Sequence, residues 1–254
     1  RFPDSFVHLM DLPRDCGTLG ERLLALEFRR LAARLEEAWG AKVTADLLRE
    51  AAGAREARRR EYLRRAEGRS GRERLRLAMA FQDPPDAAQG PEGGGAGRAA
   101  GNGVPVLLTG NLLNPEGLVS SLDAAGARAA WIDLCNGDRG FSSPVWKEDG
   151  GEGGGGREAI LSRLARGYLD RHPCARMSDG GRRYDLLLQR AREVGARGVI
   201  YASLKFCDAY LYDFPRLQER LRGSGLPLLR LESDYADGHT GQVLTRVEAF
   251  LEMI

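Results

Sequence analysis

Cysteine is scarce in this chain, which has four cysteines in 254 residues. They lie far apart and form no C-x-x-C pair, so neither a zinc ribbon nor a thioredoxin motif is present. A disulfide framework is not expected at this chain length. Taken without its neighbours, each cysteine is most simply interpreted as a small buried apolar residue. The four are Cys16, Cys135, Cys174 and Cys207.

Histidine is scarcer still, with three residues that form no constellation with a serine or a cysteine. A serine or cysteine hydrolase therefore has no visible base in this sequence. His8 and His172 indicate no chemical role. His239 stands just ahead of the last predicted helix, where we expect a loop or capping role rather than metal binding.

The chain has no excess of either charge, because 38 basic and 36 acidic residues leave a net charge of +2. The arginines are mixed with acids rather than gathered in a stripe, so nucleic-acid binding is not implied. The most basic segment, residues 55–76, also contains Glu56, Glu61, Glu67 and Glu73. This mixture predicts a solvated helix face.

Long apolar runs are also absent, since none approaches the roughly 20 residues that a membrane-spanning helix needs. Residues 1–4 contain neither a signal-peptide core nor an initiator methionine. We therefore expect a cytoplasmic protein without a membrane partner, whose sequence begins inside a longer chain. With 43% hydrophobic and 29% charged residues, the chain can bury a substantial core.

Helical periodicity marks residues 1–82 as a helical N-terminal region. Apolar residues recur with helical spacing from Leu19 to Trp39, and Gly40 follows as a C-terminal stop. Thr44 is positioned to cap a second helix that continues to Arg65. Residues 83–103 are rich in proline, glycine and alanine, and their lack of large apolar side chains predicts a flexible linker.

From residue 104 onward, short apolar strands alternate with helices, apart from a second glycine-rich loop at 150–156. This alternation predicts an α/β domain over 104–254, in which a parallel sheet is flanked by helices as in Rossmann or flavodoxin-like folds. The predicted strands are 104–109, 128–133, 198–202 and 227–232. The predicted helices are 115–125, 160–170, 182–194, 214–222 and 240–253.

Polar side chains follow each predicted strand, in the turns 109–111, 133–137, 204–208 and 232–235. The right-handed crossover rule brings these turns to one edge of the sheet, where open α/β sheets bind their ligands. Glu232 and Asp234 are candidate catalytic bases, because burial in a closed pocket raises the pKa of a carboxylate. The alternative for both is a solvated acid at a strand end or a helix cap.

Several segments resemble one known family. Lys205-Phe206-Cys207-Asp208 and the stretches 225–232 and 241–252 are similar to the C-terminal part of 2-hydroxyacyl-CoA dehydratase and benzoyl-CoA reductase subunits, of the 2-hydroxyglutaryl-CoA dehydratase D-component type. Residues 133–139 resemble the family's Asp-Leu-Cys-x-Gly-x-Arg turn, and 171–174 and 11–14 also fit. The resemblance covers nearly the whole chain, with the two glycine-rich stretches as insertions.

The resemblance implies radical chemistry in anaerobic metabolism. Family members remove water from a 2-hydroxyacyl-CoA, or reduce an aromatic acyl-CoA, by adding one electron to the thioester to form a ketyl radical anion. The electron passes through a [4Fe-4S] cluster in each catalytic subunit, and cysteine thiolates suit this cluster because they are soft ligands that hold iron. The implied partners are a homologous second subunit, an ATP-dependent activator protein as electron donor, and an acyl-CoA substrate.

Within this resemblance, Cys207 matches the cluster cysteine of the Lys-Phe-Cys motif. The family's other two cluster cysteines belong to an N-terminal domain upstream of the segment that begins at Asp11, and this sequence lacks that domain. Cys135 and Cys174 lie in family turns that are not usually described as cluster ligands, and Cys16 just precedes a helix. We therefore expect an incomplete ligand set, and an inactive protein if this piece is isolated.

Two other functions remain open. A non-catalytic assembly or regulatory module would keep the fold without cluster or substrate, and two more cysteines encoded upstream of Arg1 would instead indicate a truncated enzyme. A nucleotide-binding module would need phosphate-loop geometry. Residues 109–117 contain neither G-x-G-x-x-G nor a Walker lysine, so binding of NAD or ATP is weakly supported.

Overall fold

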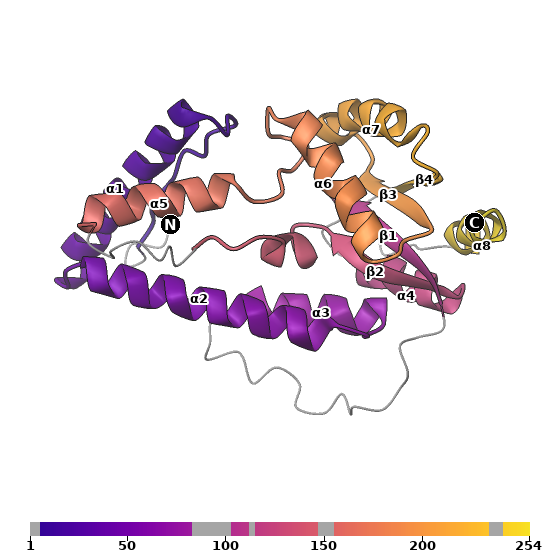
Figure 1. Ribbon diagram of the computed structural model, residues 1–254, viewed down its shortest axis with the longest axis horizontal. Coiled ribbons are helices and arrows are strands. Elements are labelled where there is room, and N and C mark those ends of the chain that lie inside the picture. The colour runs from indigo at the N-terminus through magenta and orange to yellow at the C-terminus, as the bar shows by residue number, and fades with distance from the viewer. Residues whose placement is uncertain (1–5, 83–102, 112–114, 147–154, 234–240) are drawn as a thin grey trace. The chain divides into compact units, whose positions relative to one another are not determined.

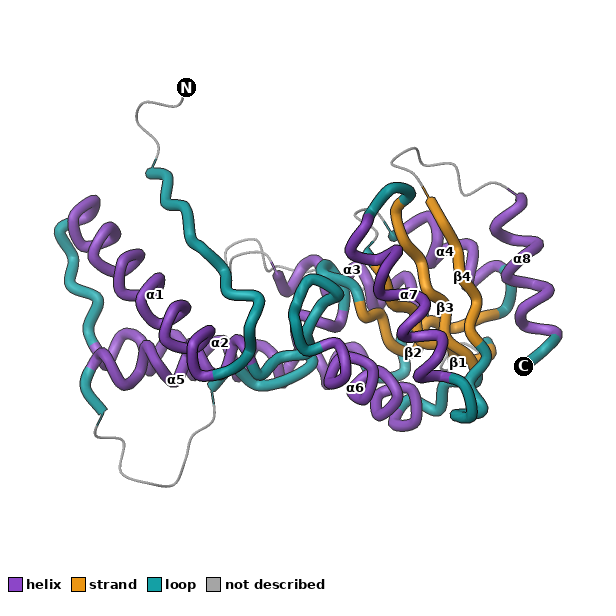
Figure 2. Tube along the Cα trace, turned by 90° about the horizontal axis from the view of Figure 1, so that it is seen from above, coloured by secondary structure: helices purple, strands orange, loops and turns teal. Residues whose placement is uncertain are grey.

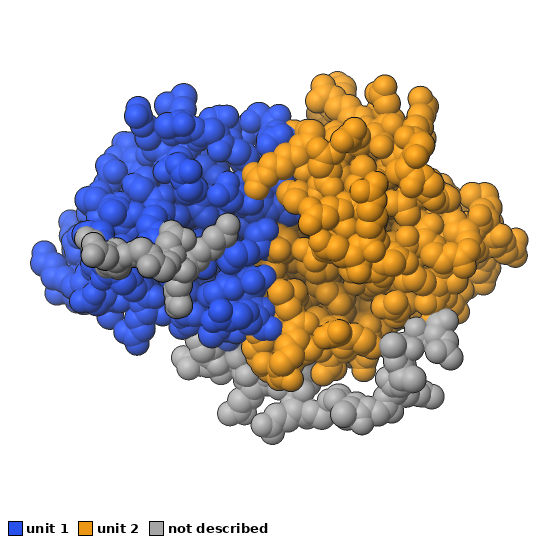
Figure 3. Space-filling view, in the orientation of Figure 1, with its two compact units in different colours: residues 1–60, 143–179 blue, residues 61–142, 180–254 orange. Residues whose placement is uncertain are grey.

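The computed structural model describes residues 6–82, 103–111, 115–146, 155–233 and 241–254 (Figure 1). They form two compact units, one from residues 1–60 and 143–179 and the other from 61–142 and 180–254 (Figure 3). The first unit thus joins segments from both sides of the predicted linker 83–103. Residues 83–102 and 150–154, which hold most of the two predicted glycine-rich stretches, lie outside the described residues.

The first unit is built from helices. Leu24 and Ala25 of α1 (Thr18–Trp39) pack against Ala165 and Leu169 of α5 (Arg157–Leu169). The predicted stop of α1 is confirmed, because Gly40 has a φ of 68° and its N–H donates to the carbonyl of Glu36.

The helix α2 (Ala45–Ala66) begins in the first unit and ends in the second. Its predicted cap is confirmed, since the Thr44 hydroxyl accepts a hydrogen bond from the backbone N–H of Leu47 at 3.3 Å. The predicted helical N-terminal region is therefore present, as α1, α2 and a third helix, α3 (Gly71–Gln82).

The second unit contains a parallel sheet, which confirms the predicted fold class. Its strands are β1 (Val104–Gly110), β2 (Ala127–Asp133), β3 (Gly198–Leu204) and β4 (Leu228–Ser233). They lie side by side in the order β2-β1-β3-β4, every neighbouring pair parallel (Figure 2). This is the strand order that begins a flavodoxin-like sheet.

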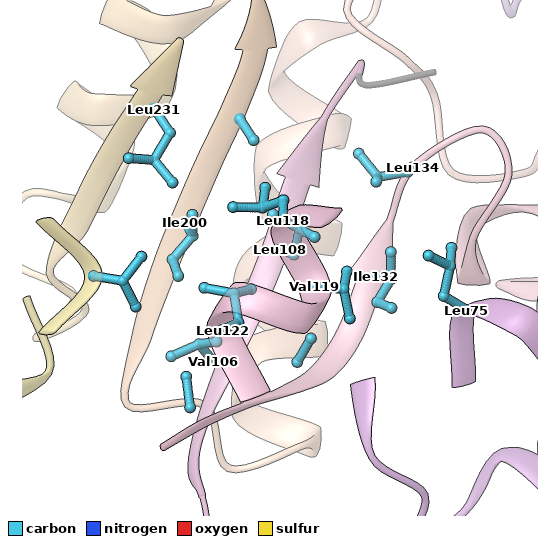
Figure 4. Packing of buried hydrophobic residues seen from close by; sticks show 14 of the residues in the cluster. Leu75, Val106, Leu108, Leu118, Val119, Leu122, Ile132, Leu134, Ile200 and Leu231 are labelled. Carbon is cyan, nitrogen blue, oxygen red and sulfur yellow. The ribbon is translucent and has the colours of Figure 1, made fainter. Parts of the chain in front are cut away.

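One face of the sheet holds the largest apolar cluster of the unit. Val106, Leu108, Ile132, Ile200 and Leu231 project from the four strands onto this face (Figure 4). The helices α4 (Glu116–Ala124) and α8 (Gly241–Glu252) cover it, and the side chains that they bury there are Leu118, Val119, Leu122, Val247 and Phe250. Burial of this apolar area is the main stabilising contribution to the unit.

The opposite face carries α6 (Gly180–Glu193) and α7 (Asp208–Leu221). Arg190 of α6 lies over the ring of Trp131 in β2, and Tyr210 of α7 packs against Tyr201 in β3. The predicted start of α7 at Phe214 is wrong by six residues. The helix begins at Asp208, and Pro215 lies inside it, although proline is favoured only in the first turn of a helix.

The basic segment 55–76 is solvated only in part. Arg64 and Glu61 form an exposed pair on α2, as predicted, and the hydrogen bond from Arg64 lowers the pKa of Glu61. The side chain of Arg74 in α3, however, is 11% exposed and ion-paired with a buried carboxylate. The alternating charges could not show this, because the partner of Arg74 is distant in the sequence.

Among the helices in the described part of the chain, none combines the length and apolar character that crossing a bilayer requires.

The close approach of β1 to β3 requires glycine at position 110. Gly110 has a φ of 148°, and a Cβ built there would lie 1.7 Å from the carbonyl oxygen of Ala202. We expect Gly110→Ala to lower the midpoint of thermal unfolding by roughly 10 °C, because a loss of about 3 kcal/mol has this effect in a chain of this size. Gly181→Ala in α6 is the control, since its Cβ would meet nothing within 4 Å. Equal midpoints for the two variants would contradict the prediction.

Candidate functional site

The carboxyl ends of all four strands meet at one edge of the sheet. β1 is bordered by β2 on one side and by β3 on the other, so the chain reverses its direction of winding between β1 and β3. Ligands of open α/β sheets bind at such a switch point. Asn111 joins the two strands there: its backbone N–H donates to the carbonyl of Ala202 at 3.2 Å, and its Oδ1 accepts from the N–H of Leu204 at 3.0 Å.

Cys207 follows β3 in a tight turn at this edge. Its backbone N–H donates to the carbonyl of Leu204 at 3.4 Å, and its own carbonyl accepts from the N–H groups of Tyr210 and Leu211 at 3.0 and 2.9 Å. Cys207 is therefore the N-cap residue of α7. Its side chain is partly buried against the apolar cluster of the sheet.

The turn after β2 is held by the guanidinium of Arg139, which lies in the short 3-10 helix Asp138–Phe141. Arg139 donates to both carboxylate oxygens of Asp133 at 2.8 and 2.9 Å and to the Asp133 carbonyl at 2.5 Å. It also reaches the carbonyl of Gly110 at 3.4 Å and the thiol of Cys135 at 3.5 Å. One side chain therefore joins the ends of β1 and β2 to the exposed Cys135.

A second buried arginine extends this network toward α7. Arg183 of α6 donates to Asp133 Oδ2 at 3.2 Å, to Thr109 Oγ1 at 3.2 Å and to Asp213 Oδ2 at 3.4 Å. The Thr109 hydroxyl donates to Asp133 Oδ2 at 2.7 Å. The two arginines and two aspartates are all buried, and their formal charges cancel.

Tyrosine hydroxyls complete the network. Those of Tyr184 and Tyr201 each donate to the carboxylate of Asp213 at 2.9 Å. The hydroxyl of Tyr210, in the first turn of α7, accepts from Arg139 at 3.3 Å. We call this set the edge network; its members are Thr109, Asp133, Arg139, Arg183, Tyr184, Tyr201, Tyr210 and Asp213.

Burial and neighbouring charges shift the pKa values of the arginines in the edge network in opposite directions. Burial alone would lower the pKa of Arg139 and of Arg183, but the carboxylate of Asp133 beside both raises the two values above the usual range. Burial raises the pKa of Tyr184 to about 12, with a further contribution from Asp213, and raises the pKa of Tyr201 for the same two reasons. The arginines therefore stay charged and the tyrosines neutral at physiological pH.

A second buried contact fixes the other end of the β2 turn. Asp138 accepts from the backbone N–H of Ile132 at 2.6 Å, from Arg74 at 2.8 Å and from the hydroxyl of Tyr62. Gly137 closes the turn, because a Cβ there would lie 2.5 Å from the carbonyl oxygen of Ile132. The Asp-Leu-Cys-x-Gly-x-Arg segment thus has a structural basis in these buried contacts.

The structure places the predicted site residues as follows. Cys207 and Cys135 belong to the second unit, and Cys16 and Cys174 to the first, where Cys174 Sγ accepts from the N–H of Arg176 at 3.4 Å. Glu232 is the last residue but one of β4 and has an exposed side chain that pairs with Arg230. Asp234 and His239 lie outside the described residues. A catalytic role for Glu232 or Asp234 stays a prediction.

No complete cluster site is found within the described ranges, since no group of three or more histidine, cysteine, aspartate or glutamate side chains there could hold a metal ion. Cys207 fits the role of a single ligand, because its thiol is partly accessible at the carboxyl edge of the sheet.

The sequence placed the turns that contain Thr109 and Asp133 at this edge, but the buried charges of α6 and α7 were not predicted, although a signal for them exists. In α7, Asp213 falls in the buried series Tyr210, Asp213, Leu217 and Leu221, with helical spacing. In α6, Arg183 precedes the buried Leu187 and Ala191 by four and eight residues. Opposite charges on the apolar stripes of two helices indicate a buried pair, because an unpaired buried charge is prohibitively costly.

These features define a class of α/β protein in which the carboxyl edge of a parallel sheet carries cysteines beside a buried network of charged side chains. A comparison with protein families identifies it further: the 2-hydroxyglutaryl-CoA dehydratase D-component family matches residues 2–254. The chain belongs to this family.

Individual relatives share limited identity. Lactoyl-CoA dehydratase subunit beta of Anaerotignum propionicum is 26% identical over 154 residues, and (R)-phenyllactyl-CoA dehydratase beta subunit of Clostridium sporogenes is 23% identical over 152. These matches cover 60% of this chain but only 39% and 38% of the two relatives. The putative dehydratase subunit YjiM of Escherichia coli is 25% identical over 270 residues, which cover 98% of this chain and 68% of that protein.

The edge network predicts a large difference between two ion pairs that join α6 to α7. We expect Arg183→Met to destabilise the protein by about 3–5 kcal/mol, because it removes the buried arginine that pairs with Asp213 and leaves Asp133 with Arg139 alone. The control is Arg220→Met, which removes the pair of Arg220 with Asp185, both more than half exposed, and should cost about 0–1 kcal/mol. Urea unfolding measures both. Similar losses of unfolding free energy in the two variants would show that burial of an ion pair does not determine how much its removal destabilises the protein.

The raised pKa of Tyr184 predicts a loss of stability at alkaline pH. Above its ordinary value of 10.0, Tyr184 ionises in the unfolded chain but stays protonated in the folded protein until about pH 12. Rising pH therefore favours the unfolded state across this interval. At pH 8, Tyr184→Phe should have a lower free energy of unfolding than the wild type, because it lacks the hydrogen bond to Asp213. By pH 11 this difference should be smaller, because only the wild type loses stability as Tyr184 ionises in the unfolded chain. Urea unfolding at both pH values tests this; a constant deficit would contradict it.

Proposed function

We propose that the chain is part of a subunit of an iron-sulfur enzyme of the 2-hydroxyacyl-CoA dehydratase or benzoyl-CoA reductase type. Membership in the D-component family supports the dehydratase assignment. The chemistry assigned to the complete enzyme is one-electron reduction of an acyl-CoA thioester to a ketyl radical, with a [4Fe-4S] cluster as the electron carrier. The residues of this chain supply part of that site.

The observation that carries the proposal is the position of Cys207. It follows β3, next to the switch point between β1 and β3, and caps the 14-residue helix α7. A helix N-terminus favours negative charge, which suits a thiolate ligand. We assign Cys207 as one ligand of the cluster and expect the other cysteine ligands to come from an N-terminal domain outside this sequence.

The edge network has a positioning role in this proposal. Arg139 fixes the turn that bears Cys135 and also contacts Tyr210 in the first turn of α7. Arg183 links the same turn to Asp213, farther along α7. The helix capped by Cys207 is thus tied to the end of β2 by buried, charge-assisted hydrogen bonds. Such rigid support is what a preorganised ligand site requires.

The proposed enzyme requires a second subunit, an electron donor and a substrate. Two of the three dehydratase relatives are named as beta subunits, so we propose that this chain acts beside a homologous second subunit. The activator protein and the acyl-CoA substrate belong to the proposal as well.

Replacement of Cys207 tests the cluster assignment. The natural protein that contains this chain is co-produced with its partner subunit and purified without oxygen, and iron, sulfide and the visible absorption spectrum are measured. We expect Cys207→Ser to lose the iron and sulfide of the cluster that this chain helps to bind, because one ligand is missing, while a cluster bound by the partner subunit is retained.

The matched controls are Cys135→Ser at the same edge and Cys174→Ser in the first unit, and both should retain the cluster. If the wild-type assembly contains no iron or sulfide, the cluster assignment fails. If Cys207→Ser retains the wild-type content, Cys207 is not a ligand.

A further inference from the structure

Phe206 adopts an unfavourable backbone conformation at the candidate site. Its φ is 62°, the sole positive value for a residue other than glycine in the part of the chain that the structure describes. Phe206 is the third residue of the turn closed by Leu204 and Cys207, and a positive φ at this position is usual for glycine or asparagine. A side chain with a Cβ is disfavoured there.

The side chain of Phe206 gains no burial in return. It is 91% exposed, the highest value among the exposed large hydrophobic residues of the described chain. A phenylalanine in a left-handed conformation with its ring in solvent is a stability cost that glycine would avoid.

The turn holds Phe206 in this conformation from both sides. Before it, the N–H of Leu204 is bound by the side chain of Asn111. After it, Cys207 caps α7 through two hydrogen bonds to its carbonyl. The ring is therefore presented beside Cys207 by an anchored backbone, and strain maintained in this way is typical of functional sites.

We propose that Phe206 contacts the apolar part of the acyl group of a bound acyl-CoA thioester and contributes to selection among thioesters. This rests on the proposed function. The occupant is inferred from the position of the ring, which adjoins Cys207 at the carboxyl edge where open α/β sheets bind ligands. Burial of the ring on binding would remove apolar surface from water and so contribute favourable free energy to binding.

The test compares Phe206→Gly with the wild type in the assembly with the partner subunit. Glycine relieves the strained φ, so the thermal midpoint should stay the same or rise by about 2–4 °C. Affinity for (R)-phenyllactyl-CoA, measured by titration calorimetry without electron donor, should fall by about tenfold to hundredfold. Affinity for lactoyl-CoA, which lacks the phenyl ring, should fall less.

Tyr212→Ala is the control, because Tyr212 is another exposed aromatic residue, 78% exposed on α7 and without positive φ. It should bind both thioesters like the wild type. Equal affinities for Phe206→Gly and the wild type would overturn the inference while leaving the proposed function intact. A lower thermal midpoint would assign Phe206 a structural role, and loss of the partner on purification would assign it to the subunit interface; both outcomes reject the inference. If the wild-type assembly binds neither thioester, the proposed function itself fails.

Discussion

The carboxylate of Asp133 is the group on which the edge of the sheet depends. It is fully buried at the end of β2 and is contacted by Arg139, Arg183 and the hydroxyl of Thr109. A buried carboxylate is stable only when it is paired and hydrogen-bonded, so its partners are constrained as strongly as the carboxylate itself. Because these partners come from β1, α6 and the turn after β2, one buried charge sets the relative positions of all three.

The two faces of the sheet contribute differently to the structure. The face covered by α4 and α8 is an apolar cluster that supplies stability through burial. The face covered by α6 and α7 buries charges near the carboxyl edge, where apolar side chains would pack at less cost. The buried charges fix the positions of the groups at this edge, since charge-assisted hydrogen bonds restrict the orientation of groups more narrowly than apolar contacts do.

Local rules of sequence and structure are broken mainly near this edge. Gly110 approaches β3 too closely for any Cβ, Arg183 and Asp213 interrupt apolar helix faces, and Phe206 has the backbone conformation of a glycine. Real proteins depart from such rules where function requires it. The family membership of the chain and the position of Cys207 at the same edge agree with this interpretation.

The sequence by itself determined the order and class of the elements, because the periodicity of apolar residues directly reports which faces are buried. The four strands, their parallel arrangement and the family of the chain were all predicted from 104–254 and the motifs around Cys207. Only the tertiary structure decided which charges are buried together. Asp133 and Arg183 are 50 residues apart, and Arg74 and Asp138 are 64 apart. The apolar stripes of α6 and α7 indicate that Arg183 and Asp213 are buried, but no local pattern shows which charges pair, since the pairs form only when separate elements pack and exclude water from the charges between them.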